Sequence, residues 1–405
     1  MNLKEILELD IKTVRGKCDI TPAEAHYDPD RLEYLNKYMC SLIKEGRIRS
    51  GSYCLSRHGK IFADTAMGTI AAEMNGSDAF TPDTLFELQS VGKLITALAV
   101  LKLAEDGILF LSQPVKDWIP EFNEEGFRDI KIINLLTHTS GLCAPEGFYS
   151  NDERDWMQYL DESDPEHSWI KAIVKTGLIA EPGEKWIYSI VGYLILGELI
   201  KRASGLEAED YIKEAILIPC EMYDTHWRKD ASPEQLLRYN IANQTDLALY
   251  EKTKTEGVTA LTAATYPRWD HIPDTAGGEM STAHEMMKLG EMILGDGYFR
   301  GKRVIGKKAL SLLWTDLTPG VCDVTFGKCA PIMYGAGVPI YSARTDIDQI
   351  LSKGTIYHEG AGSCVFLVDR DEDFVAMFQT SFIKEFDWDM RAVKGVASII
   401  WSGIM

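Results

Sequence analysis

Residues Ser90–Asp106 read SVGKLITALAVLKLAED, and Gly107 follows them. The apolar residues of this stretch recur at helical spacing, and a glycine directly after such a stretch is a common helix stop, so the segment predicts a buried helix. At about 100° per residue, Lys102 lies about 180° from Lys93, which puts the polar side of the helix opposite Lys93. Lys93 is therefore expected on the face that is buried or lines a cleft, and Ser90, nearly one turn earlier, lies on the same face.

A lysine on an inner face costs free energy unless it has a partner or a function. Loss of hydration lowers the pKa of an amine, so Lys93 could accept a proton, and Ser90 would supply it. The start of a helix also offers backbone N–H groups and a positive dipole to a developing oxyanion. The alternative is an ordinary lysine whose alkyl stem passes apolar neighbours while its ammonium reaches water. The helical phase alone does not choose between the two.

The pattern Ser-x-x-Lys is weak by itself, because it occurs four times in the chain and chance matches are expected. The other matches lie at a helix end, in an acidic stretch or after a strand, and they are Ser41/Lys44, Ser168/Lys171 and Ser381/Lys384. We give them less weight, because lysine is common at helix ends and in polar stretches. Ser90, which opens a strongly apolar helix, is thus the candidate nucleophile.

The segments outside this helix predict strands near both ends of the chain. Residues Ser52–Gly68 contain two strand-like runs around a glycine-containing turn, which indicates a β-hairpin. Cys364–Val368 and Phe374–Phe378 are apolar runs joined by an acidic turn, which indicates a second hairpin.

Helices are expected from Pro29 and over about Trp388–Ile400. With strands near both ends and a mostly helical middle, the chain predicts an α/β (α+β) fold. In this fold an antiparallel sheet, flanked by helices and built from both termini, carries an inserted, mainly helical lobe. We expect residues 1–107 and 275–405 to form the α/β lobe and residues 108–274 the inserted lobe, with the active site between them.

The composition argues against some classes of function. The chain of 405 residues has 42 basic and 61 acidic side chains, a formal net charge of −19. Such an acidic protein repels phosphate backbones, so a nucleic-acid partner is not expected. The sequence contains no zinc-helix, P-loop or G-x-S-x-G motif, and neither a metal nor a cofactor is expected.

The cysteines and the N-terminal sequence indicate the cellular compartment of the protein. The eight cysteines are scattered without a C-x-x-C pair, which predicts reduced thiols. The first residues, MNLKEILELDIKTVRGK, mix acids and lysines and lack the apolar stretch of a signal peptide. The aliphatic run Leu94–Leu101 is too short to span a bilayer. We therefore expect a cytoplasmic protein without a membrane span.

Several blocks of sequence, taken in order, are similar to one family. They are FELQSVGKLITALAVLKLAEDGILFLSQPVKDWIPEF, INLLTHTSGL, EPGEKWIYSIVGYLILGELIKRASG, YIKEAILIPCEMYDTHW, DTAGGEMSTAHEMMKLGEMIL and HEGAGSCVFLVDRDEDFVAMF, between about Phe86 and Phe378. Together they resemble the serine β-lactamase and penicillin-binding-protein-like superfamily, with its β-lactamase/transpeptidase-like fold. The nearer branch contains class C β-lactamases, D-amino-acid peptidases, family VIII-type esterases and acyltransferases.

The resemblance implies roles for particular residues. Ser90 and Lys93 match the nucleophile and base of the S-x-x-K motif. Tyr188 matches the tyrosine of the Y-x-N motif, which shares the proton transfer with the lysine. The range His358–Gly360, read HEG, matches the K-T-G position, which many relatives write as H-x-G. The backbone N–H groups of Ala361 and of the nucleophile would then form the oxyanion hole.

Three positions bear on the substrate. Ile190 stands where the β-lactamases and peptidases of the family have an asparagine, and its side chain cannot hydrogen-bond a substrate amide. This departure favours the esterase and acyltransferase relatives. Glu359 is expected either to be an ordinary loop acid or to lie beside the site, where its carboxylate would repel anionic substrates. His358 would cap its strand, donate a proton or contact the oxyanion side, and Gly360 completes the motif.

We therefore expect a serine hydrolase that carries an acyl group on Ser90 and acts on small ester, amide or lactam substrates. Carboxylesterase or acyltransferase activity is favoured. The alternatives are a D-amino-acid peptidase or amidohydrolase, a class C-like β-lactamase, and a penicillin-binding or acyl-sensing protein that is acylated without turnover. An inactive scaffold is a further alternative, and the oligomeric state is left open.

Overall fold

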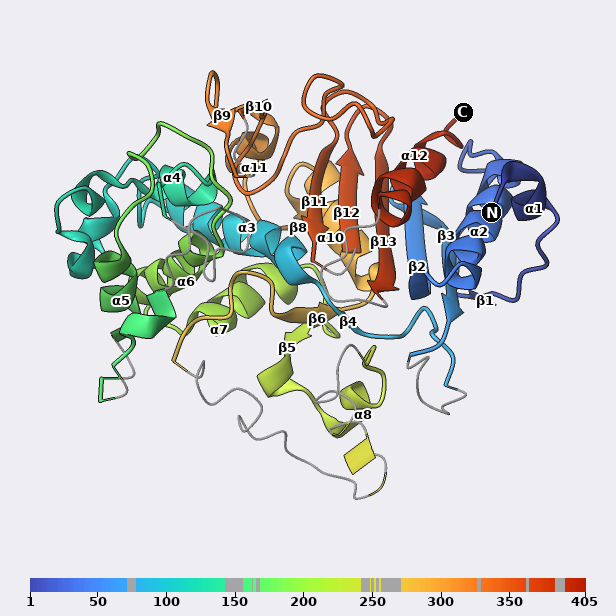
Figure 1. The fold of residues 1–405 in the computed structure, drawn as a ribbon, viewed down its shortest axis with the longest axis horizontal. Coiled ribbons are helices and arrows are strands. Elements are labelled where there is room, and N and C mark those ends of the chain that lie inside the picture. Colours follow the sequence, from blue (N-terminus) through green and yellow to red (C-terminus); the bar gives the residue numbers. More distant parts are fainter. Residues whose placement is uncertain are drawn as a thin grey trace.

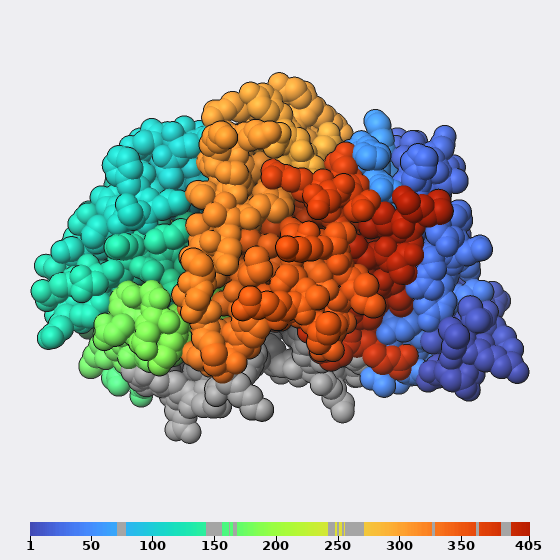
Figure 2. All heavy atoms as spheres, turned by 90° about the horizontal axis from the view of Figure 1, so that it is seen from above, coloured from blue at the N-terminus to red at the C-terminus, as the bar shows by residue number. Residues whose placement is uncertain are grey.

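The structure is a computed structural model of the chain. It describes residues 1–70, 78–142, 156–161, 163–164, 168–241, 248, 251–252, 255, 271–325, 329–361, 364–382 and 390–405. Both termini lie at the same side of the molecule, next to a sheet, and most helices lie at the other side (Figure 1). The surface view agrees, because atoms from the two ends of the chain, blue and red, lie together on one side (Figure 2).

One side of the molecule is organised by a six-stranded antiparallel sheet with the order β1-β3-β2-β13-β12-β11. Its strands are β1 (Val14–Arg15), β2 (Ile48–Arg57), β3 (Lys60–Gly68), β11 (Ile356–Gly360), β12 (Cys364–Asp369) and β13 (Phe374–Phe382). β2 pairs with β13, for example at Tyr53 and Phe378, so strands from the two ends of the chain lie side by side (Figure 1). Both predicted hairpins, β2–β3 and β12–β13, are confirmed.

The two faces of the sheet contact different hydrophobic cores, because alternate side chains of a strand point to opposite faces. In β2, Tyr53 faces the core that includes residues of α2 (Pro29–Lys44) and α12 (Val396–Trp401). Its neighbour Cys54 faces the larger core, to which α10 (Ala283–Leu294) contributes on the other face. The sheet is thus flanked by helices on both faces, as predicted.

The helices near the two ends agree with the sequence as far as the structure describes them. α2 begins at Pro29, as predicted, and the side chain of Asp28 accepts a hydrogen bond from the backbone N–H of Asp30. At the other end, a π-helical turn (Arg391–Gly395) leads into α12. Trp388, where this helix was predicted to begin, lies outside the described residues.

The other side of the molecule is mainly helical, and α3 (Gly92–Glu105) lies between its other helices and the sheet (Figure 1). Residues Gly92–Leu101 are all buried, as expected for a helix that is apolar on all sides. α3 packs against α6 (Ile190–Ser204). Apart from Lys93, the charged residues of α3 lie at its C-terminal end, where Lys102 forms an ion pair of 2.6 Å with Asp106.

A small three-stranded sheet has the order β4-β6-β5, and its strand β4 precedes the Ser90-containing turn and α3 in the chain. It consists of β4 (Phe86–Glu87), β6 (Glu279–Ser281) and β5 (His226–Trp227). Two short two-stranded sheets are formed by β7 (Tyr298–Phe299) with β8 (Lys302–Arg303) and by β9 (Cys322–Asp323) with β10 (Ala330–Pro331).

The remaining helices are short. The α-helices are α1 (Leu3–Leu7), α4 (Ile132–Leu136), α5 (Ser168–Thr176), α7 (Ala208–Ile212), α8 (Pro233–Leu236) and α11 (Lys307–Leu310). A π-helical turn (Lys213–Leu217) follows α7. The 3₁₀ turns are η1 (Gln89–Val91), Val115–Asp117, Pro120–Phe122, Phe127–Asp129, Trp156–Tyr159, Arg228–Asp230 and Ser311–Trp314. No helix in the described parts of the chain is long and apolar enough to cross a membrane.

The prediction that all eight cysteines are reduced is wrong for two of them. Cys322 and Cys329 form a disulfide across the β9–β10 hairpin, whose pairing brings their Cα atoms to 5.3 Å. The spacing of the two cysteines did not predict this pair, because the antiparallel pairing of β9 with β10, and not a C-x-x-C spacing, brings them together. Cys143 lies outside the described residues. The free thiols are Cys18, Cys40, Cys54, Cys220 and Cys364.

Candidate active site

Ser90 lies in η1, which leads directly into α3 and is called the Ser90 turn below. The Nζ of Lys93 donates a hydrogen bond of 2.9 Å to the Ser90 Oγ. Lys93 is fully buried and Ser90 is 8% exposed, so both side chains lie on the inner face of the helix, as the helical phase predicts. The Lys93 ammonium does not reach water, which removes the interpretation of an ordinary surface lysine.

A second hydrogen bond fixes the Lys93 amine, since its Nζ also donates to the Ala276 carbonyl oxygen at 2.6 Å. Burial lowers the pKa of Lys93 from 10.5 to about 7, although the negative charges of Glu279 and Asp274 act in the opposite direction. Near neutral pH a large fraction of the molecules therefore has a neutral amine, which can accept a proton from the adjacent hydroxyl.

Two glycines let other parts of the chain pack closely on the Ser90 turn. A Cβ at Gly277 would lie 2.0 Å from the Gln89 carbonyl oxygen, and Gly277 has a φ of +141°, which glycine tolerates. A Cβ at Gly360 would lie 2.6 Å from the Leu88 carbonyl oxygen. The end of β11 therefore lies directly against the Ser90 turn, and the backbone of Ala361 follows there.

Tyr188 lies just before α6, and its ring faces the Lys93 amine. The Lys93 Nζ is 5.1 Å from the centre of the Tyr188 ring. The backbone N–H of Tyr188 donates a 3.1 Å hydrogen bond to the Thr325 Oγ1, in the loop that the disulfide closes. Ser189 caps α6, because its side chain accepts a hydrogen bond from the first turn of the helix. The structure thus brings Tyr188 together with the predicted nucleophile and base.

His138 belongs to this site, although the sequence analysis assigned it no role. The centre of its ring lies 4.5 Å from that of Tyr188 and 5.2 Å from that of Tyr193. Its Nδ1 accepts a 3.1 Å hydrogen bond from the Ser189 N–H, so the proton of the neutral ring is on Nε2. Burial, and secondarily the charge of Lys93, holds the pKa of His138 well below its usual value. The INLLTHTSGL block, which contains His138, was the available signal, but a sequence block does not show which aromatic rings a residue contacts.

His358 is buried on the face of β11 that carries Gly360, and therefore faces the Ser90 turn. Its Nδ1–H donates a 3.0 Å hydrogen bond to the Glu359 carbonyl oxygen. Burial, followed by the charge of Lys93, lowers the pKa of His358 to about 3, so the ring is neutral. Its Nε2 is buried and has no hydrogen-bond partner among the described residues, and because Nδ1 carries the proton of the neutral ring, Nε2 is a lone-pair acceptor rather than a proton donor.

The two predicted substrate-binding residues are placed differently. Ile190 is the first residue of α6 and packs against the larger hydrophobic core, directly after Tyr188-Ser189. The carboxylate of Glu359 points to the opposite face of β11, where its Oε1 accepts a hydrogen bond of 3.4 Å from Gln349. Burial raises the pKa of Glu359 to about 7. The structure does not bring the Glu359 side chain together with Ser90.

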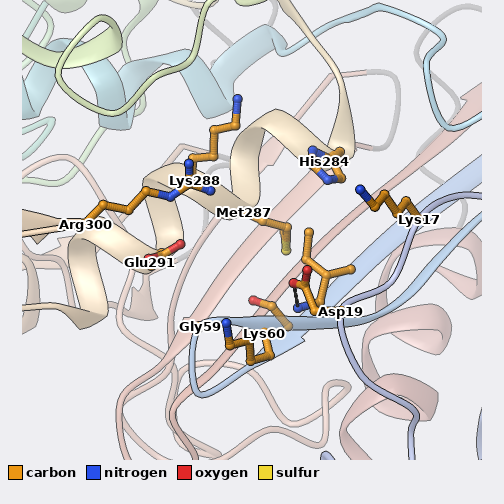
Figure 3. Close-up of a pocket in the computed structure, with 11 residues that line it drawn as sticks. Lys17, Asp19, Gly59, Lys60, His284, Met287, Lys288, Glu291 and Arg300 are labelled. Carbon is orange, nitrogen blue, oxygen red and sulfur yellow. Dashed lines mark hydrogen bonds between the residues drawn. The ribbon is translucent and has the colours of Figure 1, made fainter.

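A separate pocket of about 430 Å³ lies between one face of α10 and the β2–β3 turn (Figure 3). Its lining includes Lys17 and Lys60 as well as Asp19 and Glu291, so charges of both signs face it (Figure 3). None of the predicted site residues lines it. In the described parts of the chain, no group of three or more His, Cys, Asp or Glu side chains is arranged to hold a metal ion.

The comparison with known families decides the assignment. A family model described as Beta-lactamase matches residues 35–391. The chain belongs to the β-lactamase family. It is 35% identical over 172 residues to penicillin-binding protein 4* of Bacillus subtilis (strain 168), which covers 42% of this chain and 36% of that protein. It is 33% identical over 203 residues to esterase EstB of Burkholderia gladioli, covering 48% and 50%. The chain thus spans half or less of the length of these two relatives.

Several solved structures are similar in fold over nearly the whole chain. A family VIII carboxylesterase has a TM-score of 0.71 at 18% identity, covering 98% of this chain and 100% of that chain. Simvastatin synthase (LovD) from Aspergillus terreus has a TM-score of 0.71 at 19% identity, covering 93% and 98%. A class C β-lactamase has a TM-score of 0.68 at 16% identity, covering 93% and 97%. At these identities the likeness shows the fold, and the predicted β-lactamase/transpeptidase-like fold is confirmed.

Proposed function

We propose that this protein is a serine hydrolase that forms an acyl-enzyme on Ser90 and acts as a carboxylesterase or acyltransferase on small esters. The observation that carries the proposal is the buried Lys93 amine, which lies 2.9 Å from the Ser90 Oγ and has its pKa lowered to about 7. A lysine of this kind is costly to bury and is found where an amine must accept a proton.

In the proposed reaction, the Ser90 hydroxyl gives its proton to the neutral Lys93 amine as its oxygen attacks the substrate carbonyl. The backbone N–H groups of Ser90 and Ala361 hold the negative charge that develops on the carbonyl oxygen. Tyr188 relays the proton to the leaving alcohol, which departs and leaves the acyl group on the serine. Water, or a second alcohol in the case of transfer, then attacks the acyl group and restores the free hydroxyl.

The substrate class follows from what the site lacks. Ile190 offers no hydrogen bond to an amide, and the neutral His358 offers no positive charge to a carboxylate. The Y-x-N motif of the family has an asparagine at the position of Ile190, and its K-T-G motif has a lysine at the position of His358. These two side chains would bind anionic lactams and peptides, so their replacement favours neutral esters. The 33% sequence identity with esterase EstB supports the same choice, and the matched region covers 50% of that protein.

The test compares short p-nitrophenyl esters with a chromogenic cephalosporin, using the wild type and Ser90→Ala. We expect ester turnover that the substitution abolishes, and cephalosporin turnover at least about 100-fold slower in kcat/KM. Faster cephalosporin than ester turnover would overturn the esterase assignment in favour of a β-lactamase or amidohydrolase. Ester turnover that survives in Ser90→Ala would overturn the nucleophile itself.

The second candidate is a penicillin-binding protein that is acylated without turnover, and it is favoured by the 35% identity with penicillin-binding protein 4*. It predicts a burst of one product molecule per chain, followed by no further release. Intact-mass measurement after incubation with benzylpenicillin distinguishes the two. Under our proposal no stable penicilloyl adduct accumulates.

We also propose that the site lies between two lobes, residues 1–107 with 275–405 and residues 108–274. The support is that Tyr188 and His138 come from the middle of the chain, while Ser90 and His358 come from the flanking parts.

We also propose that the protein is located in the cytoplasm. Subcellular fractionation tests this proposal.

A further inference from the structure

The backbone around Tyr188 is hydrogen-bonded to two other parts of the chain. The first part is His138, which accepts two of these bonds. The Ile187 N–H donates to the His138 carbonyl oxygen at 2.9 Å, and the Ser189 N–H donates to the His138 Nδ1 at 3.1 Å. These bonds fix the residues on either side of Tyr188, but not the N–H of Tyr188 itself.

The second part is the β9–β10 hairpin. The Trp186 N–H donates to the Cys322 carbonyl oxygen at 2.9 Å, and the Trp186 carbonyl oxygen accepts a 3.0 Å hydrogen bond from the Val324 N–H. Both of these bonds join main-chain groups. The N–H of Tyr188 also donates to this hairpin, at 3.1 Å, but its acceptor is a side-chain oxygen, the Thr325 Oγ1. A single substitution can therefore remove this one contact.

The Thr325 side chain is fixed by its own surroundings. It is buried, and its backbone N–H donates a 2.9 Å hydrogen bond to the Asp323 Oδ1. Burial raises the pKa of Asp323, while hydrogen bonds from the backbone and the side chain of Thr325 lower it. The Thr325 hydroxyl thus donates to Asp323 and accepts from Tyr188. The Cys322–Cys329 disulfide closes the hairpin in which this threonine lies.

The place of the Tyr188 backbone matters because it carries the ring that faces the base. The Lys93 Nζ lies 5.1 Å from the centre of this ring, and the His138 ring lies against it at 4.5 Å between centres. A general acid acts only within hydrogen-bond reach of the atom that it protonates. A displacement of about 1 Å can cost on the order of 100-fold in rate, so one hydrogen bond to this backbone can affect the chemistry.

We propose that Thr325 is a positioning residue, which holds Tyr188 where its hydroxyl can deliver a proton to the leaving alcohol. The inference rests on the proposed function, which makes Tyr188 the general acid. Thr325 acts through the backbone N–H of Tyr188. An aliphatic alcohol needs the proton because an alkoxide is a poor leaving group, whereas p-nitrophenolate departs as the anion. Loss of the Thr325 hydroxyl should therefore slow the release of an aliphatic alcohol more than that of p-nitrophenolate.

The test is Thr325→Val, which keeps the branched shape of the side chain and removes its hydroxyl. kcat/KM is measured with ethyl butyrate and with p-nitrophenyl butyrate, which form the same acyl-enzyme. We expect a loss of about tenfold for the ethyl ester, from a displaced general acid, and of less than about threefold for the p-nitrophenyl ester. The ratio of the two values does not depend on how much of the protein is folded, so a loss of stability alone leaves it unchanged.

Two variants serve as controls for this ratio. Thr325→Ser keeps the hydroxyl and should restore the ratio to within about twofold of the wild-type value, because serine offers the same acceptor oxygen. Thr318→Val removes another buried threonine hydroxyl of the same region, one that donates a 3.0 Å hydrogen bond to the Asp316 Oδ1. It should leave the ratio at the wild-type value.

A double-mutant cycle shows whether Thr325 acts through Tyr188. In Tyr188→Phe no phenol remains to be positioned, so adding Thr325→Val should change kcat/KM for the ethyl ester by less than about twofold. A loss of the same size in the wild-type and Tyr188→Phe backgrounds would overturn the proposal. Equal losses for the two esters in Thr325→Val would also overturn it.

Thr325→Ala provides a second variant without the hydroxyl, for the case that valine does not fit. It should show the same change in the ratio, and wild-type ratios in both variants would contradict the proposal. Failure of both variants to fold, with Thr318→Val folded, would also contradict it, since the hydroxyl would then serve the fold. Failure of the proposed function is separate, because it appears as a wild type without ester turnover or as turnover that survives in Ser90→Ala.

Discussion

Two Ser-x-x-Lys motifs of this molecule have the same letters and opposite surroundings. In both, a serine is buried on a helical turn, Ser90 before α3 and Ser41 on α2. Lys93 is completely buried and donates to the Ser90 Oγ at 2.9 Å, whereas Lys44 is exposed in the last turn of its helix. There the Ser41 hydroxyl donates to the Tyr38 carbonyl oxygen at 2.6 Å.

The difference lies in the burial of the lysine and not in the motif, and under the proposed mechanism this burial is what would make Lys93 a proton acceptor. An exposed lysine at a helix C-terminus keeps its ammonium, because water and the helix dipole both favour the charge. A buried lysine loses the hydration that favours its ammonium, and its amine can then act as a base near neutral pH.

The largest expected effect contrasts the two motifs directly. Ser90→Ala and Lys93→Met should each lower kcat/KM for a p-nitrophenyl ester by several orders of magnitude, as loss of a nucleophile or its base does in serine hydrolases. Ser41→Ala and Lys44→Met should leave the value within about twofold, because neither residue contacts the site. Equal losses at both motifs, measured on folded protein, would show that the comparison is wrong.

Tyr188→Phe should reduce kcat/KM by about 10²–10⁴-fold, the usual contribution of a general acid–base group. The ring contact with His138, at 4.5 Å between ring centres, does not need the hydroxyl, so the thermal midpoint should stay close to that of the wild type. Steady-state kinetics and a thermal melt of the same preparation provide the check. A loss of less than tenfold would exclude Tyr188 from the proton transfer.

The pH dependence follows from the state of Lys93. Because burial lowers the pKa of this lysine to about 7, the neutral amine becomes scarce below that pH, and kcat/KM should fall about tenfold per pH unit. The profile is measured between pH 5 and 9 with a substrate that does not titrate there. A flat profile down to about pH 5 would mean that the free enzyme does not need a neutral lysine.

The smallest expected effect is on stability, and it has the opposite sign to the effect on activity. The pKa of Lys93 is lowered from 10.5 to about 7, so the unfolded chain binds more protons in this window and wild-type stability rises with pH through it. Lys93→Met should therefore raise the thermal midpoint by a few degrees at pH 7 and by less at pH 10. Lys44→Met should change stability by less than about 0.5 kcal/mol.

Regular features of the fold were predictable from the sequence, because they depend on local patterns. The two hairpins follow from alternating and apolar runs around turns, and the start of α2 at Pro29 follows from its capping residues. The burial of Lys93 was predictable because it depends on the phase of one helix. The comparisons confirm the family, while the catalytic roles and lobe boundaries stay predictions.

Features that depend on pairing or packing between separate segments were not predictable. The Cys322–Cys329 disulfide needs the β9–β10 pairing, and the contact between the tilted rings of His138 and Tyr188 joins residues far apart in the chain. Glu279 lies in a block that was recognised as family-like, but its burial against Gly92 arises where β6 meets the Ser90 turn. The hydrophobic periodicity of a single segment does not predict such a contact between two segments.

The central claim, that Ser90 is a nucleophile activated by a buried lysine, is tested most directly by covalent labelling. The wild type, Ser90→Ala and Ser41→Ala are incubated with a fluorophosphonate, and intact masses and labelled peptides are determined. The account predicts one adduct per chain on Ser90 in the wild type and in Ser41→Ala, and none in Ser90→Ala. An adduct that persists in Ser90→Ala, or no labelling of the folded wild type, would contradict it.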